Sequence, residues 1–323
     1  MTTYTASAPG KLMLFGEHAV VYGRPCLVTT VGLYVSATVT PTQTSAVTIT
    51  TPALRARGEV HTVALADLGR QLQPETAFVE AIAARALQLA EQPHGLRIDT
   101  DGPQLSYGLG SSSAVTVATA AALNAAIGLA LSQRALFDLA YSAVLDAQGK
   151  GSGFDVAAAI YGGTLWFETG GTAIEPVDAP ELPFRIGYSG AKVSTRRFVD
   201  GVEQLRERNP LIVERIFDTI GGIVVQARTA LEQGDWGKLG DLMDLNQGLL
   251  DALGVNTPAL AQLIFATRNA GALGAKLSGA GGGDCMVALA LDEQRTPIDG
   301  AIRQAGTLVE LPLGVPGVRV TVR

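Results

Sequence analysis

The sequence has little of what several classes of protein depend on. Its 323 residues contain two cysteines, three histidines and no long basic run, and only 17% of the residues are charged. Two cysteines cannot form a disulfide framework, so reduced and buried thiols are the expectation, as in a cytoplasmic protein. Three scattered histidines disfavour a histidine-based metal site. A net charge of −6 argues against nucleic acid or an anionic membrane surface as the main partner.

Long uninterrupted hydrophobic segments are also scarce, although 47% of the residues are hydrophobic. Lys11, Glu17 and His18 interrupt the apolar start of the chain, which does not resemble a signal peptide. The stretch 114–131 is apolar but rich in alanine and threonine, and it contains Asn124. It therefore predicts a packed core helix rather than a membrane span. The hydrophobic content is enough for a sizeable core, and the length fits two modest domains.

Periodicity predicts strands and helices that do not alternate strictly, which favours an α+β architecture. The predicted strands are Leu12–Phe15, Cys26–Val28, Tyr34–Val39, Ala46–Thr51, Gly95–Thr100, Gly162–Glu168, Phe184–Tyr188, Met286–Leu291 and Val318–Val322. The predicted helices are Phe78–Leu89, Ala114–Leu123, Gln133–Leu145, Pro210–Gln233, Trp236–Leu250, Thr257–Ala270 and Pro297–Ala305, with Ser132, Thr257 and Thr296 as N-caps. Glycine, proline and acidic residues crowd the segment 169–183. It predicts a boundary between domains 1–178 and 179–323. The polar stretch Arg55–Glu75 is a lid candidate by composition alone.

The most informative segment is Tyr107–Ala114, which reads Tyr-Gly-Leu-Gly-Ser-Ser-Ser-Ala. Gly108 and Gly110 can adopt backbone angles that bring the chain close to a polyphosphate. The helix that follows would direct free N–H groups and a positive dipole end at the anion. The spacing is neither that of a P-loop nor that of the dinucleotide fingerprint. A simple helix N-cap is the alternative reading of this segment alone.

Three other segments carry polar or glycine residues where the apolar pattern breaks. Lys11 stands at a strand start and can reach an anionic reacting group, although a solvated turn is the alternative. Asp155 follows a glycine-rich turn and begins an apolar helix, where it could cap the helix or bind a substrate hydroxyl. Ser278–Cys285 contains four glycines in residues 279–283, which predicts a close approach of backbone to another group. Ser189–Arg197 reads by default as a surface turn.

Together, and in this order, these segments resemble the GHMP kinase superfamily, named for galactokinase, homoserine kinase, mevalonate kinase and phosphomevalonate kinase. The resemblance covers nearly the whole chain. It implies an N-terminal α+β domain and a C-terminal ferredoxin-like domain, with ATP, Mg²⁺ and a small-molecule substrate in the cleft between them. A homodimer is a further expectation from the family.

Roles can be carried over from the superfamily residue by residue. The resemblance implies that Lys11 steadies the reacting oxygen and that Asp155 is the catalytic carboxylate. It implies ATP contacts for Gly108, Leu109, Gly110, Ser111, Ser112 and Ser113, with Ser112 near the metal. It implies substrate contacts for Glu17, His18, Ser152, Thr195, Gly279, Ala280 and Gly281.

Within the superfamily, the segments 8–23 and 249–283 resemble mevalonate kinases, which phosphorylate the 5-hydroxyl of (R)-mevalonate. The segment Gly149–Asp155 and the Asp284-Cys285 pair instead resemble phosphomevalonate kinases. A phosphorylated substrate needs added positive charge. Lys150, Lys192, Arg196 and Arg197 could supply that charge. Mevalonate is the preferred substrate and 5-phosphomevalonate the alternative.

One departure from the family concerns the metal. The family's Mg²⁺ glutamate lies eleven residues before the catalytic aspartate, and this chain has Val144 there. Asp146 is the nearby carboxylate, but it is displaced by about 200° around a helix. Asp146 is therefore a weak metal candidate. A related decarboxylase and a catalytically silent binding protein are the remaining alternatives; the presence of Lys11 and Asp155 disfavours the silent protein.

Overall fold

The computed structural model of the protein describes residues 2–103, 107–179, 182–191 and 195–322, with the side chain of Thr195 left out. An eight-stranded sheet has the order β12-β1-β2-β5-β3-β4, and β6 and β7 continue from β2. Its strands are β1 (Tyr4–Phe15), β2 (Cys26–Pro41), β3 (Ala46–Thr50), β4 (His61–Ala64), β5 (Leu96–Asp101), β6 (Thr164–Phe167), β7 (Ile174–Pro176) and β12 (Arg319–Val322). Among the described strands, β3 and β5 are the pair that runs parallel.

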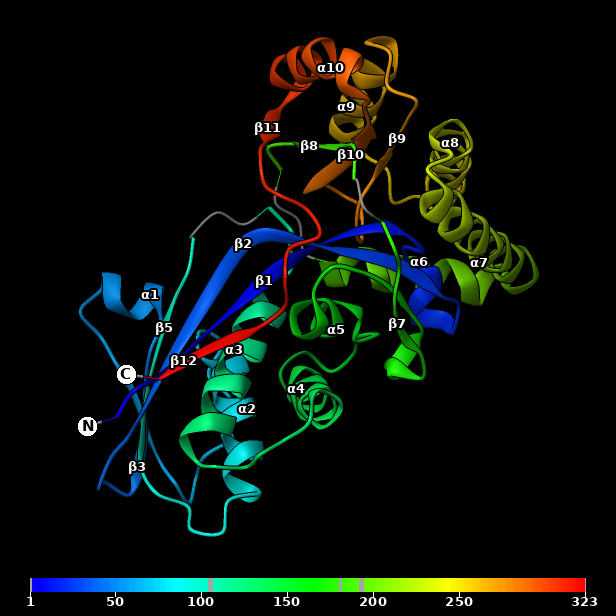
Figure 1. Cartoon of the computed structure of the whole chain (residues 1–323). Coiled ribbons are helices and arrows are strands. Elements are labelled where there is room, and N and C mark those ends of the chain that lie inside the picture. Colours follow the sequence, from blue (N-terminus) through cyan, green and yellow to red (C-terminus); the bar gives the residue numbers. More distant parts are fainter. Residues whose placement is uncertain (1, 104–106, 180–181, 192–194, 323) are drawn as a thin grey trace.

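Helices cover one face of this sheet (Figure 1). They are α2 (Ala77–Gln88), α3 (Ser111–Ala126), α4 (Gln133–Gln148) and α5 (Phe154–Tyr161). Shorter helical segments lie at its margins: η1 (Ala19–Tyr22), α1 (Pro52–Ala56) and η2 (Thr169–Gly171). Within the described ranges, no helix combines the length and apolar character needed to cross a bilayer.

A second, four-stranded sheet has the order β11-β8-β10-β9 and is antiparallel throughout. Its strands are β8 (Phe184–Tyr188), β9 (Gly274–Leu277), β10 (Cys285–Leu289) and β11 (Thr307–Val309). The helices of this part are α6 (Thr195–Arg208), α7 (Pro210–Gln233), α8 (Trp236–Ala252), α9 (Pro258–Asn269) and α10 (Asp292–Ala305). This chain order is the β-α-β-β-α-β arrangement of ferredoxin-like domains. The α+β fold class predicted from the sequence is confirmed.

Strand β1 is buried on both faces and separates two hydrophobic cores. Leu12 and Leu14 belong to the core beneath α7 and the smaller sheet, whereas Met13 belongs to the core beneath α2–α5. Successive side chains of a strand point to opposite faces, so these three residues alternate between the two cores. This explains why Leu12–Phe15 reads as an unbroken apolar run. It also places Lys11, the preceding residue, at the junction of the two cores.

Several predicted boundaries were wrong for identifiable reasons. The predicted strands Cys26–Val28 and Tyr34–Val39 are one strand, β2, that continues through Gly32. Gly32 does not end the strand; its N–H donates to the Pro312 carbonyl, and a Cβ there would lie 2.5 Å from Pro312 Cγ. The glycine therefore admits the segment that returns from the smaller sheet.

Two further predictions concerned helix α10 and the polar stretch Arg55–Glu75. Helix α10 begins at Asp292, so Pro297 lies inside it and the predicted N-cap at Thr296 was wrong. The segment Arg55–Glu75 contributes β4 to the edge of the larger sheet, and its role as a lid stays a prediction. Strand β12 returns to pair with β1, which brings the two ends of the chain together (Figure 1). The division into 1–178 and 179–323 stays a prediction.

The predicted helix Pro210–Gln233 matches α7 at both ends, because Pro210 begins it and Gly234 ends it in a left-handed conformation. The predicted caps at Ser132 and Thr257 are also confirmed. Their hydroxyls accept from the backbone N–H groups of Ala135 and Leu260.

Helix α8 lies against β9 through two facing glycines. A Cβ on Gly240 would be 2.3 Å from the Leu273 carbonyl oxygen, and one on Gly274 would be 2.4 Å from the Gly240 carbonyl oxygen. Backbone therefore packs on backbone, with no room for a methyl group. Farther along the same helix, Gly248 is exposed and a Cβ there would have no neighbour within 4 Å.

We expect opposite effects of the same substitution at these two glycines of α8. Gly240→Ala overpacks the α8–β9 contact and should lower the free energy of unfolding by about 1–3 kcal/mol. Gly248→Ala is the matched control and should raise it by up to ~1 kcal/mol, because alanine favours helix. Urea unfolding of both variants measures the difference. Equal effects of the two substitutions would contradict the packing described here.

Candidate active site

Helix α3 begins at the glycine loop with its first N–H groups free of a side-chain cap. Gly110 is the N-cap residue and Gly108 precedes it, both with left-handed backbone angles (φ 81° and 72°). The first helical bond runs from the Ala114 N–H to the Gly110 carbonyl. The amides of residues 111–113 thus precede the helical ladder and are oriented to bind an anion.

The three serines of this loop differ in exposure. Ser111 and Ser112 are exposed, whereas Ser113 is buried and only 2% exposed. Leu109 is also buried, and its carbonyl oxygen accepts from the Lys11 N–H over 2.8 Å. The hydroxyls of Ser111 and Ser112 are therefore accessible to an anion or a cation. Ser113 and Leu109 can contribute only through their backbone.

Lys11 crosses directly over the glycine loop. Its Nζ donates to the Gly108 carbonyl over 3.1 Å. A Cβ on Gly110 would lie 2.8 Å from Lys11 Cγ, so any other residue there would collide with the lysine stem. Glycine at position 110 is thus required both by its backbone angle and by the passage of Lys11.

Helix α5 brings Asp155 to the same place. Gly153 is its N-cap residue in a left-handed conformation, and Asp155 lies in the first turn with Oδ1 accepting from the Val156 N–H over 3.0 Å. The ring of Phe154, the preceding residue, has its centroid 5.5 Å from Lys11 Nζ. Burial raises the pKa of the Cys26 thiol well above its usual range, and the charges of Asp155 and Lys11 also act on it. The first turn of α5, which carries Asp155, therefore packs against Lys11 through Phe154.

The turn between β9 and β10 closes the site from the smaller sheet. Gly279 faces Lys11, since a Cβ there would lie 4.0 Å from Nζ. Asp284, which ends the turn, faces the glycine loop, because a Cβ on Gly108 would lie 2.4 Å from its Oδ2. Burial raises the pKa of the neighbouring Cys285 thiol to about 12, and Sγ donates to the Tyr107 carbonyl over 3.1 Å. Two loops about 170 residues apart in sequence are thus packed together on Lys11.

Glu17 is fully buried in an ion pair with Lys276 of β9. Asn246 of α8 donates to the second oxygen of Glu17, and Lys276 also donates to the Leu277 carbonyl. Burial raises the pKa of Glu17 and lowers that of Lys276, while their opposite charges act against both shifts. Glu17 thus lies in the core, where it positions the turn after β1. Its direct contact with substrate stays a prediction.

His18 joins the same turn to the glycine turn of the smaller sheet. It is 5% exposed, and its Nε2 donates to the Ala280 carbonyl over 3.0 Å. Its backbone has a positive φ of 59°, which is rare for a residue other than glycine. Burial lowers the pKa of His18 from 6.5 to about 4, so the imidazole is neutral at pH 7. His18 and Ala280, both predicted to contact substrate, thus contact one another.

Two other predicted site residues, Asp146 and Ser152, contact residues outside the cluster around Lys11. Asp146 forms an ion pair with Arg85 of α2, which engages both carboxylate oxygens. Ser152 is buried, and its carbonyl accepts from the Gly170 N–H. Thr195 begins α6, but its side chain lies outside the described residues, as does all of Lys192. Their assigned roles stay predictions.

Sequence reasoning missed two residues of this site. No role was assigned to Lys276, although a lysine within the apolar strand Gly274–Leu277 is itself a signal of a buried partner. Asp284 was noted only for its resemblance to another kinase. Its proximity to Gly108 depends on a contact between two distant loops, for which a single sequence carries no signal.

A cavity of about 230 Å³ lies beside the first turn of α3. Ser111 and Ser112 line one part of it, and apolar side chains line another, including Val35, Pro52, Phe78 and Val79. A polar end at free helical N–H groups and an apolar wall suit a ligand with an anionic group and a flat apolar group.

Two family models match the chain: the GHMP kinases N terminal domain over residues 77–163 and the GHMP kinases C terminal model over residues 227–303. A mevalonate kinase of Pyrococcus horikoshii is 37% identical, with 96% of this chain and 93% of that protein covered. A mevalonate kinase of Thermococcus gammatolerans is 35% identical, with coverages of 98% and 97%.

Solved structures agree with these matches. The L. major mevalonate kinase in complex with R-mevalonate has a TM-score of 0.75 and 27% identity, covering 96% of this chain and 95% of that one. The Streptococcus pneumoniae phosphomevalonate kinase in complex with phosphomevalonate and AMPPNP has a TM-score of 0.80 at 22% identity, covering 96% and 99%. The second likeness shows the shared fold.

We expect the neutral, buried state of His18 to make stability depend on pH. In the unfolded chain the imidazole binds a proton near pH 6.5, whereas in the folded protein it does so only near pH 4. The unfolded state therefore gains protons first as the pH falls, and stability is lost between these values. At pH 4.5 the loss attributable to His18 should be about 2–3 kcal/mol.

Urea unfolding at pH 7 and pH 4.5 measures this effect when the wild type is compared with His18→Asn. Asparagine can still donate to the Ala280 carbonyl and tolerates positive φ, but it does not titrate. The wild type should lose more stability on acidification than the variant. Equal losses would show that His18 does not stay neutral in the fold.

Proposed function

Because the chain belongs to the GHMP kinase family, we propose that it transfers the γ-phosphoryl group of ATP to the 5-hydroxyl of (R)-mevalonate. What supports this proposal is that the first turn of α5, which carries Asp155, packs on Lys11, whose Nζ donates to the glycine loop before the free N–H groups of α3. The names of the relatives supply the substrate. Cytoplasmic location and the homodimer remain predictions.

The glycine loop is suited to hold the phosphates of ATP. The amides of residues 111–113 and the accessible hydroxyls of Ser111 and Ser112 offer hydrogen-bond donors where the helix dipole is positive. The adjoining cavity with its apolar wall would take the adenine ring and ribose. Lys11, whose Nζ reaches Gly108 of this loop, would bind the terminal phosphate and neutralise its charge.

Asp155 would act on the acceptor. Its carboxylate is held by the Val156 N–H at the start of α5, so it is fixed on a rigid element. From there it would accept a hydrogen bond from the 5-hydroxyl and then the proton, as the oxygen attacks phosphorus. Catalysis in such transfers rests on positioning and charge neutralisation.

Among its described residues, the protein offers few side chains that could bind Mg²⁺. The described ranges hold no cluster of three or more histidine, cysteine or acidic side chains suited to a metal ion. Ser112 offers an exposed hydroxyl at the first turn of α3, next to the proposed phosphates. We propose that Ser112 and phosphate oxygens hold the ion, which would neutralise phosphate charge when bound.

Replacing Asp155 should separate catalysis from nucleotide binding. Asp155→Asn keeps the shape of the side chain but cannot accept a proton, so turnover should fall by about 10²–10⁴. ATP affinity should stay within about threefold. The matched control is Asp138→Asn, an exposed aspartate paired with Arg134 on α4, which should keep full turnover. Turnover of Asp155→Asn near that of the control would remove Asp155 from the mechanism.

A second experiment tests the substrate. A coupled assay of ADP release, with mevalonate and 5-phosphomevalonate side by side, should give the higher kcat/KM with mevalonate. A preference for 5-phosphomevalonate would instead assign the chain to the phosphorylation of that compound. Turnover of neither compound would overturn the proposed function.

A further inference from the structure

Helix α6 packs directly on the glycine turn that faces Lys11. The ring of Phe198 occupies the space beside Gly282, where a Cβ would lie only 1.9 Å from Phe198 Cε2. Val202, one turn later, is 1% exposed. The remainder of the helix is strongly amphipathic and carries many charges. Those charges therefore lie on an element that packs against the glycine turn of the site.

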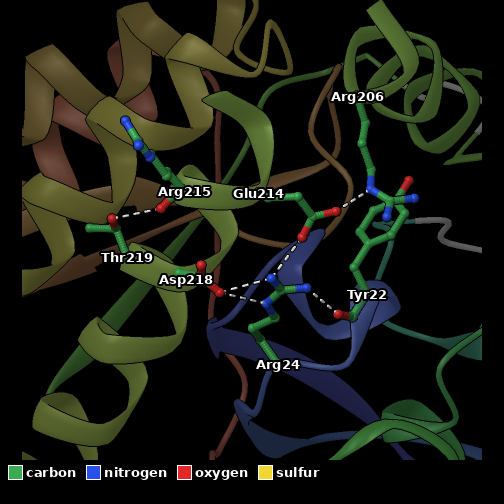
Figure 2. Close-up of polar contacts among 7 residues, drawn as sticks. All are labelled: Tyr22, Arg24, Arg206, Glu214, Arg215, Asp218 and Thr219. Atoms are coloured by element: carbon green, nitrogen blue, oxygen red, sulfur yellow. Dashed lines mark hydrogen bonds and ion pairs between the residues drawn. The ribbon is translucent and has the colours of Figure 1, made fainter. Parts of the chain in front are cut away.

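A network of ion pairs, shown in Figure 2, anchors the C-terminal end of α6. Arg206 donates to Glu214 of α7, and Arg24 donates to both Glu214 and Asp218 over 2.7 and 2.8 Å. The Arg206 guanidinium also lies 5.0 Å from the Tyr22 ring centroid. This network joins the C-terminal end of α6 to α7 and to the segment that holds Tyr22 and Arg24.

The middle of α6 makes a different contact. Asp200 and Glu203, three residues apart and hence on one face of the helix, both bind Lys150. The Glu203 Oε2 is 3.1 Å from Lys150 Nζ. Asp200 also faces Arg196 at 3.8 Å. The hydrogen bonds that Lys150 donates to Asp200 and then to Glu203 raise the pKa of Lys150, so the lysine stays charged.

Lys150 belongs to the glycine-rich loop that ends at Asp155, the proposed base. Lys150 is thus a cation close in sequence to the proposed base, and it could bind a phosphate on the acceptor. Because two carboxylates already bind it, an incoming dianion would have to displace them. With Arg196 included, the four charges of this cluster sum to zero.

We infer that Asp200 and Glu203 determine which acceptor the site takes. By occupying Lys150 they favour an acceptor whose reacting group is an uncharged hydroxyl and disfavour one whose reacting group is a phosphate. This inference rests on the proposed function and deepens it. It makes both carboxylates positioning residues that act through Lys150, since neither is proposed to touch the substrate.

The size of the effect follows from the hydrogen bond between Lys150 and a substrate phosphate, which the two carboxylates prevent. A hydrogen bond between a lysine and a phosphate is charge-assisted, and its loss changes binding by about tenfold to hundredfold. A monoanionic substrate with a hydroxyl acceptor loses much less. Replacing the two carboxylates should therefore change the ratio of kcat/KM between the two substrates more than it changes kcat or KM for mevalonate.

The test is the double variant Asp200→Asn/Glu203→Gln, assayed with mevalonate and 5-phosphomevalonate. The ratio of kcat/KM should move toward the phosphate ester by about tenfold or more. Adding Lys150→Met to the double variant should reverse that gain. Lys150→Met alone should move the ratio the opposite way, because it leaves two carboxylates without their cation.

The matched control is Glu214→Gln, which removes a carboxylate from the anchor at the other end of α6. Its ratio should stay within about twofold of the wild type. An equal shift in this variant would assign the effect to loosening of α6 and overturn the inference. So would an unchanged ratio in the double variant while the wild type prefers mevalonate. A wild type that does not use mevalonate would instead overturn the proposed function.

Discussion

The buried ion pair between Lys276 and Glu17 is the constraint on which the arrangement of the site depends. Both side chains are fully buried, so each would be costly to bury without the other. Such a pair adds little net stability compared with two apolar residues, but removing one partner leaves an uncompensated charge. We interpret its role as positional. It allows the turn after β1 to meet β9 in only one arrangement, with Asn246 binding the remaining oxygen.

That arrangement explains how residues far apart in the chain meet at Lys11. Beyond the ion pair, Ser278 donates to the Met13 carbonyl and His18 to the Ala280 carbonyl, so three contacts join β1 and the turn after it to β9 and the glycine turn. Strand β1 also separates the two cores, and packing from both sides fixes its position. Lys11 therefore emerges from a rigid strand, as its proposed contact with a phosphoryl group requires.

The sequence predicted those parts that local physical chemistry determines. Helix α7 begins at a proline and ends at a glycine, and both ends were predicted correctly. The α+β fold and the family followed from ordered motifs. What failed depended on distant contacts: β2 was predicted as two strands, because the sequence does not reveal that Pro312 packs on Gly32. Lys276 was given no role for the same reason, since its partner lies 259 residues away.

The four glycines of the turn 279–283 illustrate how such contacts combine. Gly281 approaches the Val255 carbonyl, where a Cβ would lie 2.3 Å away, and Gly282 approaches Phe198 of α6. Gly279 alone of these three faces a charged group, Lys11 Nζ, with the hypothetical Cβ at 4.0 Å. Two of the glycines are thus needed to pack the turn against the protein. The third keeps a side chain away from the one lysine that the proposed reaction requires, so a single short turn serves both packing and access.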